Sequence, residues 1–360
     1  MTAFAAAAPP EPTRKARGLR PEIVMRRAIL TVAMSGVVLA FLSPLAYSAL
    51  TSLKSEAQVT DSEAPALPSD ARTFDYQGET YDVYVVPLPD GSTRELALVR
   101  KGRQDSDFVD PANPGAGPIN WVGSWRTLEQ SWQVAPQWGN YAEVWNLIDF
   151  PRLLFNTVAL ALIGTIGTVL SCTLVAYGFA RFRFPARGLL FTVLLATIFL
   201  PDAVTLIPTY TLFVKLGWVG TWLPLLVPAF FANAYDVFLI RQYLLTIPRD
   251  LDEAAAIDGA SSFRILRSVI LPQAWPVIVA VSIFTFVYSW NDFFGPLIYL
   301  AGHDDIQPLQ VGLSHFNGIY HTRPNLIQAG NIMTLLIPVL LFAIFQRVFT
   351  RGIVITGVEK

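Results

Sequence analysis

The chain has one cysteine, three histidines and little charge for its length. Of its 360 residues 15% are charged and 53% are hydrophobic, whereas soluble domains carry roughly 25% charged residues. The single cysteine, Cys172, excludes an internal disulfide framework and a cysteine-based metal cluster. A net charge of −1 gives no basic excess for neutralising phosphates, so no nucleic-acid partner is expected. The scarcity of charge instead favours a membrane protein.

Motifs for nucleotide binding and for hydrolysis are missing as well. The sequence contains no Gly-x-x-x-x-Gly-Lys-Ser/Thr, no nucleophile elbow and no paired zinc-ligand motif. The histidines His303, His315 and His321 are spaced too widely for a compact metal site. We therefore expect no catalytic residue, no metal and no cofactor bound by this chain. A membrane-embedded transferase, which would need a cluster of charge at one membrane face, is disfavoured.

Six stretches are apolar and long enough to cross a membrane as helices. About 20 helical residues, rising ~1.5 Å each, cross the ~30 Å hydrocarbon core of a bilayer. We predict an all-α polytopic membrane protein with spans at about 28–50, 157–179, 189–213, 221–241, 275–299 and 327–349. Prolines interrupt several spans, and carbonyls freed in lipid must be satisfied by neighbouring helices or water. A first helix at 28–50 is thus followed, after an insert, by a core of five packed helices at 151–349.

Lys and Arg residues gather at alternate ends of these spans, which sets the orientation. The tail at 1–27 is basic, and three arginines without an acid lie between the second and third spans. Basic residues also lie in the segment 249–272 and in the tail at 350–360. We expect both tails and this segment to face the cytoplasm of a bacterial cell. The first span is too long for a cleavable signal peptide and has no clear cleavage site.

The second span carries a small residue at every fourth position. These residues are Gly164, Thr168, Cys172, Ala176 and Ala180. Small residues at this spacing let helix backbones approach closely in a membrane. Cys172 belongs to this stripe, and packing is favoured over a redox role because free cysteine behaves as a small buried hydrophobe.

The segment 54–150 is polar and acidic, with 15 Asp and Glu against 7 Lys and Arg, a net charge of −8. Alternating Tyr, Val and Leu residues predict a β-hairpin from strands at 80–86 and 94–100, with a turn at 89–92. A shorter strand is predicted at 73–76. The stretch 105–118 is rich in Asp, Pro and Gly and is predicted to be a loop. We expect a small extracytoplasmic insert with β-strands.

A spaced motif lies between the fourth and fifth spans. Glu253-Ala254-Ala255 is followed after three residues by Gly259, and after nine more by Val269-Ile270-Leu271-Pro272. This pattern resembles the coupling loop of bacterial ABC importer permeases, in which Ile most often stands where Val269 does. The resemblance implies that the loop contacts a separate ATPase subunit. The implied contact residues are Glu253, Ala254, Ala255, Asp258, Gly259, Ala260, Leu271 and Pro272.

The residues of this segment predict a helical hook. Pro248 suits a helix start, and the acids that follow it face the positive end of the helix. Gly259 allows a sharp turn into a second helix at 261–270, on which Phe263, Leu266 and Ile270 share a face. We predict that Leu271-Pro272 ends this second helix and begins the next span.

The resemblance covers residues 140–360 and the first span. Within the ABC importer permeases, this chain most resembles the carbohydrate-uptake branch and, in that branch, the subunit similar to the maltose permease G protein. This resemblance is carried by Asn140-Tyr141, Asn156-Thr157, Ala176 to Arg181, Ile207 to Tyr210, Phe238 to Tyr243, Ala256 to Ala260, Trp290-Asn291-Asp292 and Gln346 to Lys360. It implies a homologous second permease subunit, an ABC ATPase dimer that binds ATP and Mg, an extracytoplasmic solute-binding protein, and sugar as the transported substrate. The acidic insert departs from the usual short first outer loop.

Polar residues in apolar spans are default candidates for a transport path. They are Asn233, Asp236, Asn291 and Asp292, although Asp236 is favoured to pair with Arg241 instead. In the last outer loop, binding-protein contact is assigned to Phe316, Asn317, Tyr320 and His321, because aromatic faces and amides suit sugar rings. An ordinary capping loop is the favoured reading, and binding-protein contact is the sharper hypothesis. The insert is either a cover for the outer rim or a docking surface for the binding protein.

These features together predict the permease subunit of an ATP-driven sugar importer in the bacterial inner membrane. The subunit would form half of the pore, and the two halves together would open alternately to the outside and to the cytoplasm. A permease for amino acids or polyamines is the runner-up. A secondary transporter is less favoured because it would typically show internal repeats, and none is detectable here.

Overall fold

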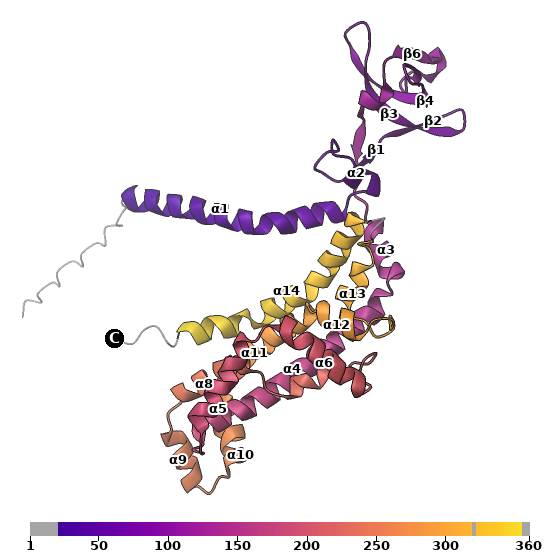
Figure 1. Cartoon of the computed structure of the whole chain (residues 1–360). Coiled ribbons are helices and arrows are strands. Elements are labelled where there is room, and N and C mark those ends of the chain that lie inside the picture. The colour runs from indigo at the N-terminus through magenta and orange to yellow at the C-terminus, as the bar shows by residue number, and fades with distance from the viewer. Residues whose placement is uncertain (1–20, 319–321, 355–360) are drawn as a thin grey trace, which may run out of the picture. The chain divides into compact units, whose positions relative to one another are not determined.

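The computed structural model describes residues 21–318 and 322–354 (Figure 1). The chain divides into two compact units, Met1–Tyr47 and Ser48–Lys360. Helix α1 (Pro21–Ser52) begins in the first unit and ends in the second. Its side chains from Met25 to Tyr47 are exposed and mostly apolar, as suits a helix surrounded by lipid.

Five helices of the described residues are long and apolar enough to cross a membrane. They are Met25–Ser52, Phe150–Arg181, Leu223–Thr246, Ser262–Trp290 and Pro324–Gln346. A sixth span exists if the pair Arg187–Phe199 and Ala203–Lys215, which is bent by 100°, crosses as one broken span. The break falls at Leu200-Pro201, where proline holds the preceding residue in an extended conformation. The helical class is as predicted, and the number of spans is five or six.

The helices of the second unit differ widely in length. The long ones are α4 (Phe150–Arg181), α11 (Leu271–Trp290) and α14 (Pro324–Val354). The shorter ones are α2 (Glu56–Thr60), α3 (Gly139–Leu147), α5 (Arg187–Ala196), α6 (Asp202–Lys215), α7 (Leu223–Leu226), α8 (Ala234–Thr246), α9 (Asp250–Ile257), α10 (Ser262–Ile265), α12 (Phe294–Tyr299) and α13 (Leu309–Ser314). The π-helical segment η5 (Leu266–Ile270) joins α10 to α11.

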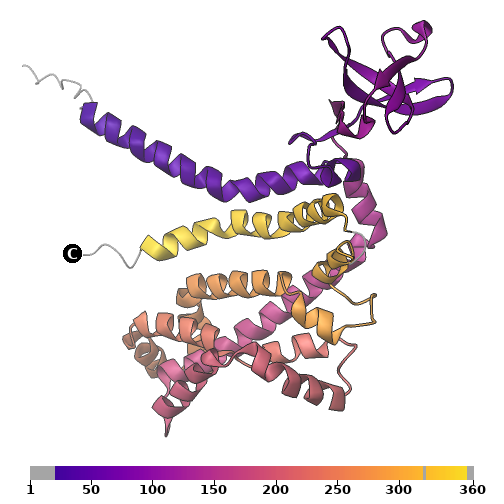
Figure 2. The same cartoon turned by 45° about the horizontal axis from the view of Figure 1, so that its top comes forward.

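Helix α4 forms the centre of the bundle and packs along both α8 and α11 (Figures 1 and 2). The small residues predicted to form its packing stripe are all buried; they are Gly164, Thr168, Cys172, Ala176 and Ala180. A Cβ added to Gly164 would lie 3.4 Å from Ser289 Oγ of α11, so the glycine allows this close approach. The structural role predicted for Cys172 is thereby supported, because its thiol lies inside the α4–α8 contact.

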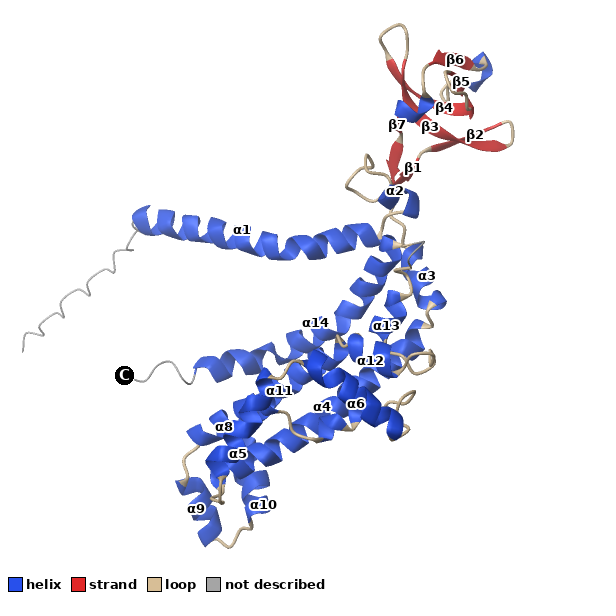
Figure 3. Cartoon of the chain, viewed as in Figure 1, coloured by secondary structure: helices blue, strands red, loops and turns tan. Residues whose placement is uncertain are grey.

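The insert is a small β-domain, and the strands in Figure 3 all come from it. Its strands are β1 (Ser69–Ala71), β2 (Thr73–Tyr76), β3 (Glu79–Pro87), β4 (Thr93–Arg100), β5 (Asp105–Val109), β6 (Ile119–Val122), β7 (Glu129–Gln130) and β8 (Trp132–Val134). The larger sheet is antiparallel in the order β2-β3-β4-β5-β6, with β7 also paired to β3. The predicted hairpin is present as β3–β4, and the predicted short strand is β2.

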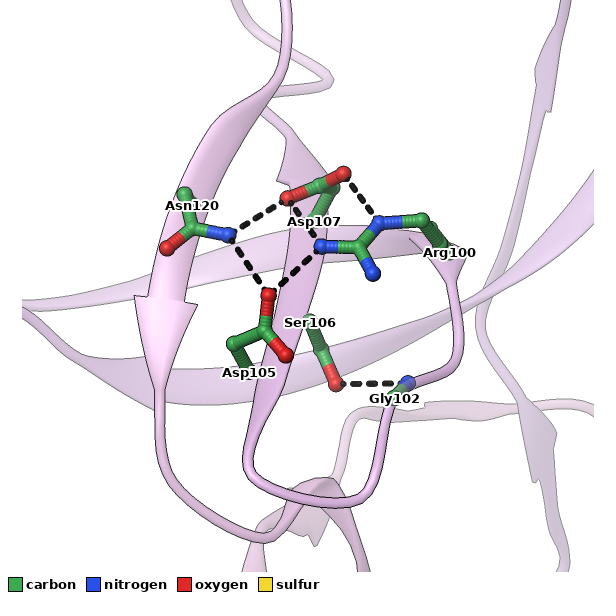
Figure 4. Close-up of polar contacts among 6 residues, drawn as sticks. All are labelled: Arg100, Gly102, Asp105, Ser106, Asp107 and Asn120. Carbon is green, nitrogen blue, oxygen red and sulfur yellow. Dashed lines mark hydrogen bonds and ion pairs between the residues drawn. The ribbon is translucent and has the colours of Figure 1, made fainter.

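Strand β5 lies inside the stretch that was predicted to be a loop, so that part of the prediction is wrong. Ser106 and Phe108 are buried, while Asp105 and Asp107 point to the other face and pair with Arg100 (Figure 4). The Arg100 Nε–Asp107 Oδ2 distance is 2.5 Å, and Arg100 Nη2 donates to Asp105 Oδ2 at 2.8 Å. Asn120 of β6 donates to Asp107 Oδ1 at 2.8 Å. The carboxylates therefore tie three neighbouring strands together.

The base of the insert is held by a polar cluster near the N-terminal ends of α3 and α14. Arg323, just before α14, pairs with Glu143 of α3 at 2.6 Å and with Glu56 of α2 at 3.3 Å. The Asn140 amide donates to the carbonyls of Ser52 and Lys54 at 2.8 and 2.9 Å. From this base the two short strands β1 and β8 pair with each other and lead into the larger sheet.

Candidate functional site: a helical hook and a membrane cavity

The motif segment folds as a helical hook, which we define as residues 249–272. Three acids occupy the first turn of α9, where they face the positive end of the helix. The helix ends in a Schellman motif. Gly259 has φ +78°, its N–H donates to Ala256 O at 3.0 Å, and the Ala260 N–H donates to Ala255 O at 3.0 Å. The Ser261 hydroxyl then accepts from Arg264 N and caps α10. The turn predicted at Gly259 is confirmed.

The motif residues divide between the two faces of the hook. The exposed ones are Glu253, Ala254, Asp258, Gly259 and Pro272. Ala255, Ala260 and Leu271 pack against the buried cluster formed by α4, α8 and α11. The outer face therefore presents a carboxylate, small residues and backbone, while the inner face is attached to the bundle.

Apolar side chains also lie on the outer face of the hook. Ile257 is 87% exposed and Phe263 is 67% exposed. The sequence predicts that Phe263 shares a helix face with Leu266 and Ile270, but Phe263 is exposed whereas Leu266 and Ile270 are buried. Ile265, Leu266 and Ile270 are the buried residues, because they meet α4 and α8 in the core cluster. The outer face of the hook is therefore partly apolar.

The second helix of the hook does not end at Leu271-Pro272, contrary to the prediction. The span Ser262–Trp290 runs through these residues as a helix. Pro272 has no N–H, and its ring would clash with the carbonyl four residues earlier in a regular α-helix. The π-helical turn Leu266–Ile270 precedes the proline and widens the helix there, so the chain continues without a break. The hook is thus covalently and helically continuous with α11.

A cavity of about 480 Å³, lined by both apolar and polar groups, lies between α4, α7, α8 and α11. Its lining residues are Gly164, Thr168, Leu225, Pro228, Ala229, Phe231, Asn233, Tyr235, Asp236, Phe284, Thr285, Tyr288 and Ser289. Two of the four predicted path residues, Asn233 and Asp236, are in this lining. The lining combines hydroxyls, an amide, one carboxylate and four aromatic rings, and none of these described lining residues is Lys, Arg or His.

Asn233 and Asp236 are linked at the start of α8. The Asn233 side chain accepts from Asp236 N at 2.9 Å and its amide donates to Asp236 Oδ2 at 2.7 Å. The favoured pairing of Asp236 with Arg241 is not made. The Arg241 guanidinium instead lies 4.2 Å from the ring centroid of Phe191 and donates to Phe179 O. Arg241 is five residues from Asp236 along α8, so the two side chains point to different sides of the helix.

Asn291 and Asp292 lie outside the lining of this cavity and end α11. The Asn291 amide donates to Val287 O at 2.8 Å, and Asp292 Oδ1 accepts from Gly295 N at 3.2 Å in the first turn of α12. Their contacts here are those of residues that break the span.

The last outer loop gives a mixed result for the predicted binding-protein contacts. Phe316 is 8% exposed and packs with Leu153 and Leu313, so it is part of the core rather than a contact surface. Asn317 is exposed and pairs with Thr322. Tyr320 and His321 lie outside the described residues. An apolar side chain beside α4 and α13 gains more by burial than by facing water, which explains the correction for Phe316.

Comparison with known proteins supports the membrane fold and the family. The profile described as "Binding-protein-dependent transport system inner membrane component" matches residues 172–355. The osmoprotective compounds uptake permease protein GgtD of Synechocystis sp. is 32% identical over 257 residues, covering 70% of this chain and 85% of that protein. The arabinooligosaccharides transport system permease protein AraQ of Halalkalibacterium halodurans is 32% identical over 204 residues, covering 57% of this chain and 72% of that protein.

A solved structure shares the fold. A bacterial ABC transporter involved in import of the acidic polysaccharide alginate aligns with a TM-score of 0.61 at 18% identity, covering 92% of this chain and 99% of that chain. With the family profile spanning half of the sequence, the apolar helices and the hook identify the chain as a multi-pass membrane permease subunit of the binding-protein-dependent transport system inner membrane component family.

Proposed function

We propose that this chain forms half of the translocation pore of an ATP-driven sugar importer and that its hook couples the pore to an ATPase subunit. The observation that carries the proposal is the two-faced hook. Its outer face exposes Glu253, Ala254 and Ile257, while Ala255 and Ala260 attach the inner face to the bundle. A surface that is exposed on one side and rigidly attached on the other is suited to receive movement from a partner and pass it to the membrane helices.

The outer face of the hook has the chemistry of a docking surface. Alanines and a glycine allow a partner backbone to approach closely, and Ile257 and Phe263 supply apolar contact area. Glu253 offers a carboxylate that an Arg of the partner could bind through charge-assisted hydrogen bonds. The partner ATPase dimer would bind ATP and Mg. A homologous second permease subunit and an extracytoplasmic binding protein would complete the importer.

The sugar assignment rests on the carbohydrate-uptake resemblance, on the arabinooligosaccharide relative and on the cavity. Hydroxyl and amide groups can hydrogen-bond to sugar hydroxyls, and the rings of Phe231, Tyr235 and Phe284 offer apolar faces for sugar C–H groups. The lining has the carboxylate of Asp236 and no described cation. It therefore suits a neutral sugar better than an anionic one. Asn233 and Asp236 are the path residues of this half.

The mechanism is alternating access, in which ATP shifts the population between inward- and outward-open states rather than pushing the solute directly. Both tails and the hook face the cytoplasm in this scheme, and the insert lies outside. ATP binding closes the ATPase dimer and displaces the hook, the cavity opens outward to receive the sugar, and hydrolysis resets it inward.

Cysteine cross-linking tests the docking of the hook. The native Cys172 is fully buried, so a cysteine introduced at Ile257 would be the accessible thiol among the described residues. In native membranes, Ile257→Cys should cross-link to a co-purifying ATPase through a short bifunctional maleimide, and ATP should change the yield. Val122→Cys on the insert is the matched control at an exposed apolar position. A hook thiol that reacts freely but never joins an ATPase would contradict the proposal.

A further inference from the structure

The C-terminal end of α4 is held by two arginines, one in α8 and one at the start of the hook. Arg241 Nε donates to Phe179 O at 3.4 Å, and Arg249 Nη2 donates to Ala180 O at 3.3 Å. Carbonyls in the last turn of a helix have no partner within the helix, and this helix end carries partial negative charge. Two cations thus satisfy the end of α4 from outside.

Arg181, the last residue of α4, reaches in the opposite direction. Its Nη2 donates to Ile247 O at 3.0 Å, just after α8. Its Nε lies 2.8 Å from Asp252 Oδ2 of α9, and the two side chains are only 6% and 19% exposed. This ion pair is therefore mostly shielded from water, where removal of one partner leaves a charge without compensation.

The helical period of α9 explains why Asp252 alone among the three acids is turned inward. Asp252 and Ala255 are three residues apart and share the face that packs on the bundle. Asp250 and Glu253 lie two positions before and one position after Asp252, and both are exposed. We define Arg181, Arg241, Arg249 and Asp252 as the arginine joint.

Two of the helices that meet at the arginine joint, α4 and α8, also form walls of the cavity. Thr168 of α4 lines the cavity and is separated from Arg181 by about 20 Å of continuous helix, at ~1.5 Å per residue. Helix α8 begins at the cavity, where Asn233 caps it, and ends next to Ile247. A displacement of α9 would therefore reach both walls if the joint holds, and could be absorbed in the link 247–249 between α8 and α9 if it does not.

We propose that the arginine joint transmits hook movement to the cavity, with Arg181 and Asp252 as positioning residues. The inference rests on the proposed function and deepens it by naming the groups through which the coupling passes. Neither residue touches solute or nucleotide. Their effect is to make α4, α8 and α9 move together.

Cavity labelling in the purified importer complex tests the joint. Tyr235→Cys places a thiol in the cavity lining at a half-exposed position, and the buried Cys172 contributes little background. The probe is a membrane-impermeant methanethiosulfonate, and the readout is the change in labelling rate on adding ATP and Mg. In the Tyr235→Cys background we expect a change of about fivefold or more, the factor that ~1 kcal/mol gives. Adding Asp252→Asn should abolish this change while ATP hydrolysis persists.

Three further variants define the outcome. Asp252→Glu keeps the charge and should restore most of the ATP response, and Asp250→Asn, which removes an exposed acid one half-turn away, should leave it unchanged. Should Asp252→Asn fail to assemble, Arg249→Gln removes only the bond to Ala180 O and serves the same test.

The failures are distinguishable. A Tyr235→Cys complex that hydrolyses ATP without any labelling response contradicts the proposed function itself. A normal response in Asp252→Asn overturns the joint while leaving the proposed function standing. Loss of assembly, thermal stability and hydrolysis together in both Asp252→Asn and Arg249→Gln assigns the joint a purely structural role and also overturns the inference.

Discussion

Replacing Gly259 by alanine isolates the backbone turn of the hook from every other property of the loop. The glycine is at φ +78°, and a Cβ built there meets nothing within 4 Å. The substitution therefore introduces no clash and removes no side-chain contact. Its effect comes only from the backbone conformation, which an L-residue other than glycine adopts at a cost of about 1–2 kcal/mol.

The net magnitude follows from two opposing terms. Alanine also restricts the unfolded or undocked loop, which favours the ordered hook by about 0.4–1 kcal/mol. The difference leaves a penalty of about 0.8 kcal/mol at the midpoints of the two ranges and about 1.6 kcal/mol at most. This corresponds to about a 4-fold loss of the docked hook, and at most about a 14-fold loss, at ~1.4 kcal/mol per tenfold. We expect sugar transported per ATP hydrolysed to fall by this factor in reconstituted vesicles. Gly259→Asn should lose less, because asparagine tolerates the left-handed region.

Gly217 provides a matched control in the same chain. It ends α6 in the same Schellman arrangement, with its N–H donating to Val214 O at 3.0 Å and the Trp218 N–H donating to Phe213 O at 2.9 Å. Its φ is +69°, and a Cβ there also meets nothing within 4 Å. Gly217→Ala should cost similar stability and leave the coupling ratio unchanged. Equal coupling ratios in the two alanine variants would refute a special role for the hook turn.

Three further predictions concern packing and charge. Gly330→Ala places a Cβ 2.2 Å from Leu313 Cδ2 in the buried α13–α14 contact, so it should lower the free energy of unfolding by about 1–3 kcal/mol. Thermal unfolding in detergent measures this loss, with Gly178→Ala as the control because a Cβ at Gly178 meets nothing within 4 Å. Arg323→Gln removes the pairs to Glu56 and Glu143; because these groups are partly exposed, the loss should be about 1 kcal/mol or less, with faster proteolysis at the base of the insert than in Arg152→Gln. Hydrogen bonds from Arg100 lower the pKa of Asp105 and Asp107. The stabilisation that these ion pairs give is therefore present at neutral pH and is lost as the pH falls below the ordinary carboxyl pKa and through the lowered pKa. Hydrogen exchange of the β5 amides should become faster in acid, and Arg100→Gln should make the exchange rate depend less on pH.

The features of this protein that could be predicted from its sequence are those set by local residue patterns. The alternating apolar residues of β3 and β4, with turn residues between them, predicted the hairpin. The small residues at every fourth position of α4 predicted its packing face. The hook turn followed from Gly259, because few other residues adopt its conformation. Strand β5 was missed because its aspartates resemble loop residues, although Ser106 and Phe108 alternate with them in a strand-like period.

Contacts between distant segments were beyond prediction from residue patterns alone. Arg181 and Asp252 are 71 positions apart, and no local pattern indicates that Asp252 rather than Asp250 or Glu253 is the inward acid. Asn233 and Asp236 were found as path candidates because polar groups are rare in apolar spans, but the assignment of Asp236 to Arg241 failed on helix geometry. The π-helical turn before Pro272 was missed because proline ordinarily marks a helix boundary.

The paired strands β1 and β8 bring together the two ends of the segment 72–131, which forms the larger sheet. Ala71 is the register partner of Trp132, and the Arg72 N–H donates to Ser131 O at 2.8 Å. A coding segment for 72–131 could therefore be swapped for a tight turn, or for an unrelated fold, without altering where the neighbouring backbone begins and ends. Lineages carrying such a permease can therefore diversify the segment 72–131 while the membrane helices are inherited intact.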